Sequence, residues 1–179
     1  MIPLILLAGK SGAGKSTVAE YLHKKYGYTQ VLSYTTREKR GESDNTHVFL
    51  SDEEFDKINR KDMVAYTEFA GHRYCATKEM VESANIYVID PDGILEFKER
   101  YHGDRPYIVI YLGVTKRERF QRMLLRGDSV EEAGKRITND EKKFASITKC
   151  EPYIIDATDK TAEEVGDEIV NMVNKTHNC

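Results

Sequence analysis

The chain has 179 residues, a length typical of one compact domain with a substantial hydrophobic core. Its formal net charge is −3, so the composition lacks the basic excess that indicates nucleic-acid binding. Cys75, Cys150 and Cys179 are far apart and form no CxxC pair, which argues against a disulfide framework or a zinc site and favours reduced thiols in a cytoplasmic protein.

The first predicted element is a buried strand. The apolar run Ile2 to Ala8 is too short for a membrane span and lacks the basic leader of a signal peptide, so we expect no membrane association. Gly9 to Thr17 follows directly and reads GKSGAGKST, which fits the pattern GxxxxGK[ST], and the helix-like run Val18 to Tyr26 comes next. This strand, pattern and helix are the context that a phosphate-binding loop requires, although a glycine-rich turn without a ligand is the alternative.

The residues of this loop predict an ATP site. The glycines let consecutive backbone N–H groups point at phosphate oxygens, and the positive end of the helix dipole adds to the attraction. We expect Lys15 to neutralise the β and γ phosphates and Ser16 to bind Mg²⁺. The predicted ATP-binding residues of the loop are Gly9, Ser11, Gly12, Ala13, Gly14, Lys15, Ser16 and Thr17.

The rest of the chain alternates between strands and helices. Further apolar runs predict parallel strands covered on both faces, at Ile86 to Ile89, Tyr107 to Leu112 and Tyr153 to Ile155. Further helices are expected at Ile94 to Tyr101, Lys116 to Arg126 and Thr161 to Lys175, the last with a capping box of Thr161 and Glu164. This alternation predicts an α/β fold of three layers, with a parallel central sheet and ligands at the carboxyl ends of its strands.

Two segments interrupt the alternation. Gln30 to Ala76 contains turn-rich and alternating pieces, which predict a small, partly antiparallel α+β insert with one helix at Ser51 to Asn59. Arg126 to Phe144 is highly charged and predicts a helical hairpin or lid. We therefore expect one domain, in which an insert of about 33–76 and a lid of about 126–147 extend from a core of 1–32, 77–125 and 148–179.

A second anion site is predicted in the insert. Arg37 and Arg40 lie three residues apart among hydroxyl side chains, on a loop expected near the carboxyl edge of the sheet. Guanidinium groups bind phosphate with two hydrogen bonds, so this pair could face the loop that begins at Gly9. Two opposed phosphate sites are what phosphoryl transfer between nucleotides needs, and a solvated charged loop is the alternative.

The segment around these arginines resembles a known signature. Ser33-Tyr34-Thr35-Thr36-Arg37, followed by Arg40-Gly41-Glu42, is similar to the signature of guanylate kinases. The similarity continues through Phe69 to Tyr74, Val88 to Gly93 and Arg122 to Arg136, and so covers most of the chain. It implies a P-loop nucleoside monophosphate kinase of the cytoplasm that transfers the γ-phosphate of Mg·ATP to GMP or dGMP.

The resemblance also implies roles for single residues. The monophosphate would be bound by Ser33, Arg37, Arg40, His47, Glu68, Tyr74 and Asp92. Catalysis would depend on Lys15, Arg37, Arg126 and Arg136, with Arg122 as a further ATP ligand and Asp90 beside Ser16 at the metal. Plainer interpretations exist: Asp90 to Gly93 is typical of a turn that caps a helix, Tyr74 of a core aromatic, and His47 of a surface strand residue. The lid arginines are also typical of a solvated helix face.

Two positions depart from the family pattern. Ala65 stands where the family places the glutamate that reads guanine, and Ala76 where it places a serine or threonine that supports the same base. The chain could therefore act on another acceptor, such as a different nucleotide or ribose 1,5-bisphosphate. A binding module without catalysis is a third hypothesis, but such relatives have degenerate phosphate loops and Gly9 to Thr17 is intact. The sequence gives no indication of the oligomeric state.

Overall fold

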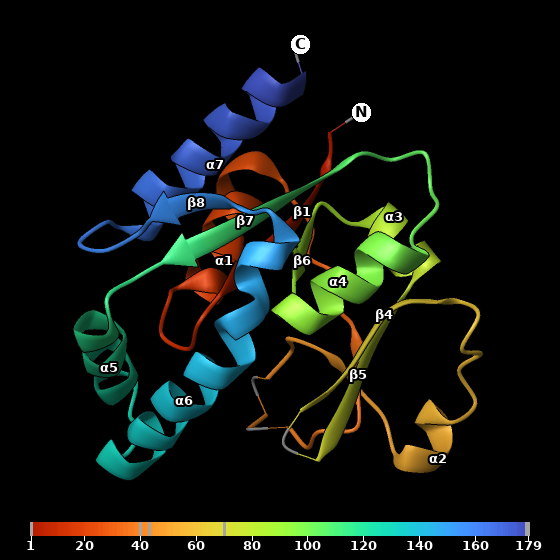
Figure 1. Cartoon of the computed structure of the whole chain (residues 1–179), viewed down its shortest axis with the longest axis horizontal. Helices are drawn as coiled ribbons and strands as arrows, with labels where there is room; N and C mark the ends of the chain where they lie inside the picture. The colour runs from red at the N-terminus through yellow and green to blue at the C-terminus, as the bar shows by residue number, and fades with distance from the viewer. Residues whose placement is uncertain (1, 40, 43, 70, 178–179) are drawn as a thin grey trace.

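A computed structural model describes residues 2–39, 41–42, 44–69 and 71–177 (Figure 1). Its central sheet has four parallel strands in the order β6-β1-β7-β8. They are β1 (Leu4–Gly9), β6 (Ile86–Val88), β7 (Tyr107–Gly113) and β8 (Tyr153–Asp156). The predicted apolar runs form these strands, and the predicted parallel sheet is confirmed.

Strand β1 is buried along its whole length because helices cover both faces of the sheet. Leu4, Leu6 and Ala8 pack into one hydrophobic cluster, which includes residues of helix α4 (Pro91–Arg100). The alternate residues Ile5 and Leu7 pack into a second cluster with helices α1 (Lys15–Tyr26) and α7 (Ala162–His177). Burial on both faces explains the continuous apolar sequence of the strand and gives the three layers predicted for the fold.

Three helices of the core begin at residues whose side chains cap them. Thr161 and Glu164 form the predicted capping box before α7, and Thr115 caps α5 (Lys116–Leu125). Asp90 caps α4, since its side chain accepts a hydrogen bond from the backbone N–H of Gly93. Helix α3 (Lys78–Ser83) and the 3-10 helix η1 (Phe144–Cys150) were not predicted from the sequence.

The insert forms a second, smaller sheet with the strand order β3-β2-β5-β4. Its strands are β2 (Tyr34–Thr35), β3 (Val48–Phe49), β4 (Met63–Phe69) and β5 (His72–Thr77). The pairs β4-β5 and β2-β5 are antiparallel and β2-β3 is parallel, so the expectation of a partly antiparallel insert is met. The helix expected at Ser51 to Asn59 is only α2 (Asp52–Phe55), because the chain turns after one capped turn.

The charged segment after α5 folds as one helix, α6 (Val130–Lys143), which forms a hairpin with α5. Gly127 lies in the turn between them with a φ of +103°, a conformation that favours glycine. Met123 of α5 packs against Ala133 and Ile137 of α6 in a small hydrophobic cluster. The two helices thus extend from the central sheet as a packed pair.

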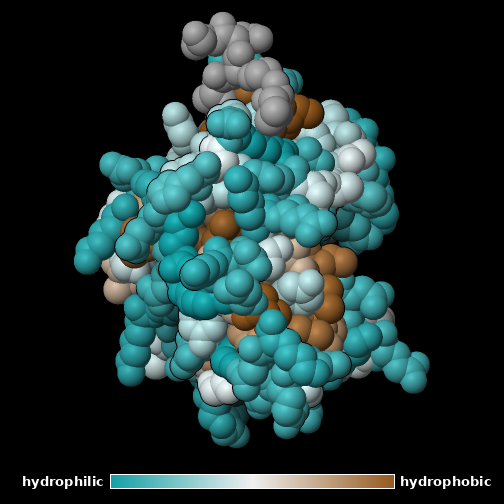
Figure 2. Space-filling model, turned by 90° about the vertical axis from the view of Figure 1, so that its right-hand side faces the viewer, coloured by the Kyte–Doolittle hydropathy of each residue, from teal (hydrophilic) through white to brown (hydrophobic). Residues whose placement is uncertain are grey.

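The surface agrees with the charged composition. Hydrophilic side chains cover most of the face shown in Figure 2, and hydrophobic ones gather in a patch near its middle. Within the described residues, no helix is both long and apolar enough to cross a membrane. Cys75 and Cys150 are buried free thiols, whereas Cys179 lies outside the described residues. Burial raises the pKa of Cys75 to about 12, which makes this thiol a poor nucleophile.

Candidate nucleotide-binding site

A cavity of about 860 Å³ lies at the carboxyl end of β1. One side is formed by the loop from Gly9 to Ser16, which joins β1 to α1, and another by residues of the insert. The hairpin of α5 and α6 contributes charged side chains to a third side. The volume lies in the upper part of the range typical of small-molecule sites, and the position is the one expected for ligands of α/β sheets.

The loop has the backbone shape of an anion site. Gly12 and Gly14 have φ values of +78° and +88°, which only glycine adopts readily. Gly14 is the N-cap of α1 and, as glycine, brings no side chain to cover the first N–H groups of the helix. A helix N-terminus open to a cavity attracts phosphate through these N–H groups and the helix dipole.

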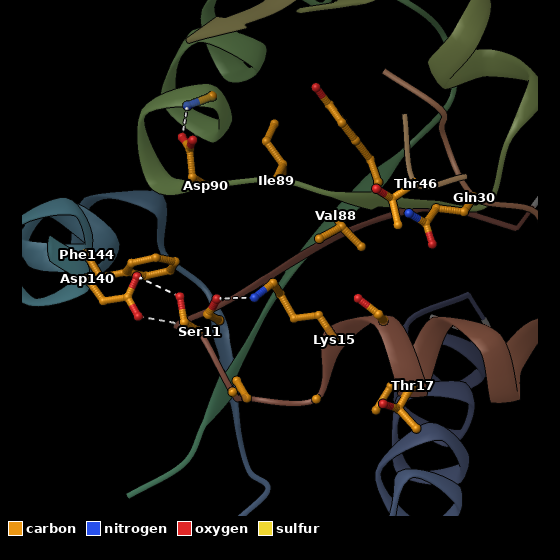
Figure 3. Close-up of a pocket in the computed structure, with 18 of the residues that line it drawn as sticks. Ser11, Lys15, Thr17, Gln30, Thr46, Val88, Ile89, Asp90, Asp140 and Phe144 are labelled. Atoms are coloured by element: carbon orange, nitrogen blue, oxygen red, sulfur yellow. Dashed lines mark hydrogen bonds between the residues drawn. The ribbon is translucent and has the colours of Figure 1, made fainter. Parts of the chain in front are cut away.

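Lys15 lies in the cavity beside the loop that carries it (Figure 3). Its ammonium group donates hydrogen bonds to the carbonyl oxygens of Gly9 at 2.5 Å and Lys10 at 3.4 Å. Burial lowers the Lys15 pKa to about 8, Asp140 opposes this effect, and Arg119 and Arg126 add to it. The ammonium group is therefore charged at neutral pH and loses its proton in the mildly alkaline range.

The insert side of the cavity brings together four predicted residues: Ser33, Arg37, His47 and Tyr74. Ser33 Oγ and His47 Nδ1 are hydrogen-bonded at 2.9 Å, and the His47 ring packs against Tyr74 with ring centroids 5.7 Å apart. Arg37 forms an ion pair with Asp44 at 3.0 Å, and both side chains are about nine-tenths buried. Arg40, the other predicted phosphate ligand, lies outside the described residues.

The predicted lid arginines Arg122, Arg126 and Arg136 all line the cavity. Arg126 and Arg136 share the carboxylate of Asp128, at 2.7 and 3.2 Å. Arg122 pairs with Glu118 on the preceding turn of α5. The structure thus places three guanidinium groups on the same cavity as Lys15 and Arg37.

The three predicted acidic residues differ in position. Asp90 lines the cavity, but its oxygens are occupied, one by the N–H of Gly93 at 2.9 Å and the other by Lys143 at 2.7 Å (Figure 3). Asp92 is exposed on α4 and is not among the described residues around the cavity. Glu68 does not line the cavity either, and its carboxylate accepts a hydrogen bond from the Tyr66 hydroxyl. Of these three predicted acidic residues, only Asp90 lines the cavity.

The two alanines that depart from the family pattern are neighbours. Ala65 and Ala76 pair across β4 and β5, both are buried, and Ala65 lines the cavity. Tyr87 of β6 belongs to the same hydrophobic cluster and also lines the cavity. The wall near Ala65 is therefore neutral. Tyr87 was missed because its place in an apolar run is typical of a core residue.

Two charged residues of α6, Asp140 and Lys143, were also missed. Asp140 contacts the phosphate-binding loop at Ser11, and Lys143 bridges to Asp90. Ala133, Ile137 and Asp140 form the buried stripe of this amphipathic helix. An aspartate in an otherwise apolar stripe is a signal that could have identified Asp140 from the sequence.

The class of protein follows from this arrangement. A parallel sheet whose first strand runs into a glycine-rich anion loop, with a lysine and arginines around one cavity, defines a P-loop nucleotide-binding protein. A family model described as "AAA domain" matches residues 5–145.

Known proteins identify the family. The chain is 34% identical over 175 residues to the guanylate kinase of Helicobacter pylori (strain ATCC 700392 / 26695), covering 90% of this chain and 83% of that protein. It is 33% identical over 157 residues to the guanylate kinase of Porphyromonas gingivalis (strain ATCC BAA-308 / W83), covering 80% and 83%. The crystal structure of guanylate kinase from Anaplasma phagocytophilum shares the fold, with a TM-score of 0.61 at 21% identity, covering 97% of this chain and 86% of that chain. The chain belongs to the guanylate kinase family, as the resemblance predicted.

Proposed function

We propose that this protein transfers the γ-phosphate of Mg·ATP to GMP or dGMP, giving ADP and the corresponding diphosphate. The observation that carries the proposal is that Lys15, on the phosphate-binding loop, and Arg37, on the insert, line the same cavity. Direct transfer needs a donor site and an acceptor site that open onto each other. The relatives named guanylate kinase support the choice of acceptor.

The donor half of the reaction rests on charge neutralisation. The N–H groups at the start of α1 and the Lys15 ammonium would bind the phosphates of ATP. Arg126 and Arg136 would exchange their shared partner Asp128 for phosphate oxygens, while Arg122 supplies a further positive charge beside Gly14. These groups would stabilise the negative charge that builds up on the migrating phosphoryl group and the departing ADP.

The acceptor half rests on orientation. Arg37 would hold the phosphate of GMP, and its contacts with Asp44 and the Phe49 ring fix the guanidinium before the acceptor binds. His47 and Tyr74 border the same region. An oxygen of the GMP phosphate would attack the γ-phosphorus and the bond to the ADP oxygen would break. This transfer needs no covalent enzyme intermediate.

The donor residues fit magnesium that arrives with ATP. The Ser16 hydroxyl follows Lys15, is exposed and lines the cavity, and hydroxyl and phosphate oxygens are the hard ligands that Mg²⁺ prefers. Asp90 could contribute only after releasing Lys143. No cluster of three or more acidic, histidine or cysteine side chains suited to a metal occurs among the described residues. We therefore assign Ser16 as the protein ligand of the metal, which would offset phosphate charge.

The same proposal includes the predicted roles of the insert, the lid and the core. Residues of about 33–76 would act as the monophosphate-binding insert and those of about 126–147 as the lid, on a core of 1–32, 77–125 and 148–179. The separate sheet of the insert and the α5–α6 hairpin, both facing one cavity, support this division. Closure of the lid would exclude water and limit ATP hydrolysis. A cytoplasmic location is proposed with it, as expected for a family of nucleotide metabolism.

An ADP-release assay tests the acceptor. The purified protein would be given Mg·ATP with GMP, dGMP, AMP, CMP, UMP, dTMP or ribose 1,5-bisphosphate in turn, with Lys15→Ala as the inactive control. We expect turnover with GMP or dGMP to exceed that with every other acceptor, and Lys15→Ala to lose it while keeping the fold. Efficient turnover of a different acceptor in place of GMP would refute the guanylate kinase assignment and show that the neutral wall at Ala65 marks an altered pocket.

A further inference from the structure

A carboxylate of α6 contacts the phosphate-binding loop directly. Asp140 Oδ2 accepts a hydrogen bond from the backbone N–H of Ser11 at 2.7 Å, and Oδ1 accepts one from the Ser11 hydroxyl at 3.2 Å (Figure 3). The Asp140 side chain is only 9% exposed. A buried negative charge beside an anion site works against phosphate unless it is compensated, so its presence there calls for a physical reason.

Arg119 of α5 supplies the compensation and also binds the loop. Its guanidinium is 3.4 Å from Asp140 Oδ2, donates to the Ser11 carbonyl oxygen at 3.4 Å, and is 3% exposed. The Ser11 residue is therefore held on both sides, at its N–H by Asp140 and at its C=O by Arg119. At the next residue, Gly12 lies so close to α5 that an added Cβ would be 2.6 Å from the Arg119 carbonyl oxygen.

We propose that Asp140 is a positioning residue which, together with Arg119, fixes the Ser11 peptide and holds the phosphate-binding loop in its anion-binding shape before ATP arrives. The proposal rests on the proposed function in taking ATP as the ligand of this loop. A loop ordered in advance removes conformational entropy that ATP binding would otherwise cost. Because Asp140 lies at the end of α6, the same contact joins the predicted lid to the ATP site.

Two substitutions separate the hydrogen bonds of Asp140 from its charge. Asp140→Asn keeps an oxygen that can accept from the Ser11 N–H, whereas Asp140→Ala removes both features. Calorimetric titration with Mg·ATP, without an acceptor, should show about tenfold weaker binding for Asp140→Ala, the factor that corresponds to 1.4 kcal/mol. For Asp140→Asn the loss should be smaller than for Asp140→Ala, because an oxygen that accepts from the Ser11 N–H remains. Glu131→Gln, an exposed carboxylate of α6 paired with Lys135, is the matched control and should bind like the wild type.

Kinetics and folding complete the test. With GMP as acceptor, Asp140→Ala should raise the KM for ATP and leave the KM for GMP within about twofold. Unchanged or tighter ATP binding would overturn the proposal, as would an equal loss of affinity for both substrates. If circular dichroism shows that Asp140→Ala does not fold, the ATP affinity and the two KM values of Asp140→Asn are used to test the proposal. A wild type that binds ATP but does not phosphorylate GMP would refute the proposed function and leave this test valid.

Discussion

We predict that ATP binding depends on pH through the protonation of Lys15. With a pKa of about 8 in the ligand-free protein, the ammonium group is mostly charged at pH 7 and mostly neutral at pH 9. Phosphate binding requires the charged form, so raising the pH from 7 to 9 should weaken ATP binding about tenfold, and binding at pH 8 should take up about half a proton. The affinity follows from calorimetric titration with Mg·ATP, and the proton uptake from repeats in buffers of different ionisation enthalpy.

The variant Lys15→Arg is the control for this prediction. A guanidinium stays charged throughout the range, so the affinity of this variant, although lower at pH 7, should not fall further at pH 9. The titration of Lys15 would not weaken ATP binding by unfolding the protein at high pH. The unfolded chain holds the Lys15 proton up to the ordinary pKa of 10.5, so between pH 8 and 10.5 this lysine makes the folded state more stable as the pH rises. Equal wild-type affinities at pH 7 and pH 9 would refute the reasoning.

Two further substitutions test the acceptor site and the loop. Arg37→Ala should raise the KM for GMP by roughly ten- to a hundredfold and leave the KM for ATP unchanged in initial-rate assays, and an unaltered KM for GMP would contradict its role. Gly12→Ala should lower the free energy of unfolding in urea by about 1–3 kcal/mol, because of the positive φ and the close Arg119 carbonyl. Gly134→Ala, where an added Cβ meets no described atom within 4 Å, should instead stabilise α6 by about 0.5–1 kcal/mol.

The features that the sequence predicted depend on short stretches of chain. Strand β1 could be predicted because burial on both faces requires an apolar residue at every position from Leu4 to Ala8. The phosphate-binding loop could be predicted because Gly12 and Gly14 meet a backbone requirement that few other residues satisfy. In both cases the residues that satisfy the physical requirement lie close together in the sequence.

Features that depend on distant contacts could not be predicted in the same way. The role of Asp140 depends on Ser11, 129 residues away, and on Arg119 of another helix. Glu68 is a different case, because alternation along β4 already contained the answer. Ala65 packs into the cluster that includes β1 and α4, whereas Tyr66 packs with Phe55 and Cys75 in another cluster. Because side chains of a strand alternate between its faces, Glu68 lies on the same face as Tyr66.

The charges around the cavity explain how an acidic chain can keep an anion site ready. The formal net charge is −3, yet the cavity is lined by several cations, each paired with a carboxylate: Arg37 with Asp44, Arg122 with Glu118, Arg126 and Arg136 with Asp128, and Lys143 with Asp90. These carboxylates orient the cations. Pairs with an exposed member, such as Arg126 with Asp128, contribute only about 0–1 kcal/mol, so phosphate can replace the carboxylate at little cost. The pair of Arg37 and Asp44 is buried and is screened less by salt, so the acceptor side should keep its geometry at ionic strengths that loosen the lid arginines.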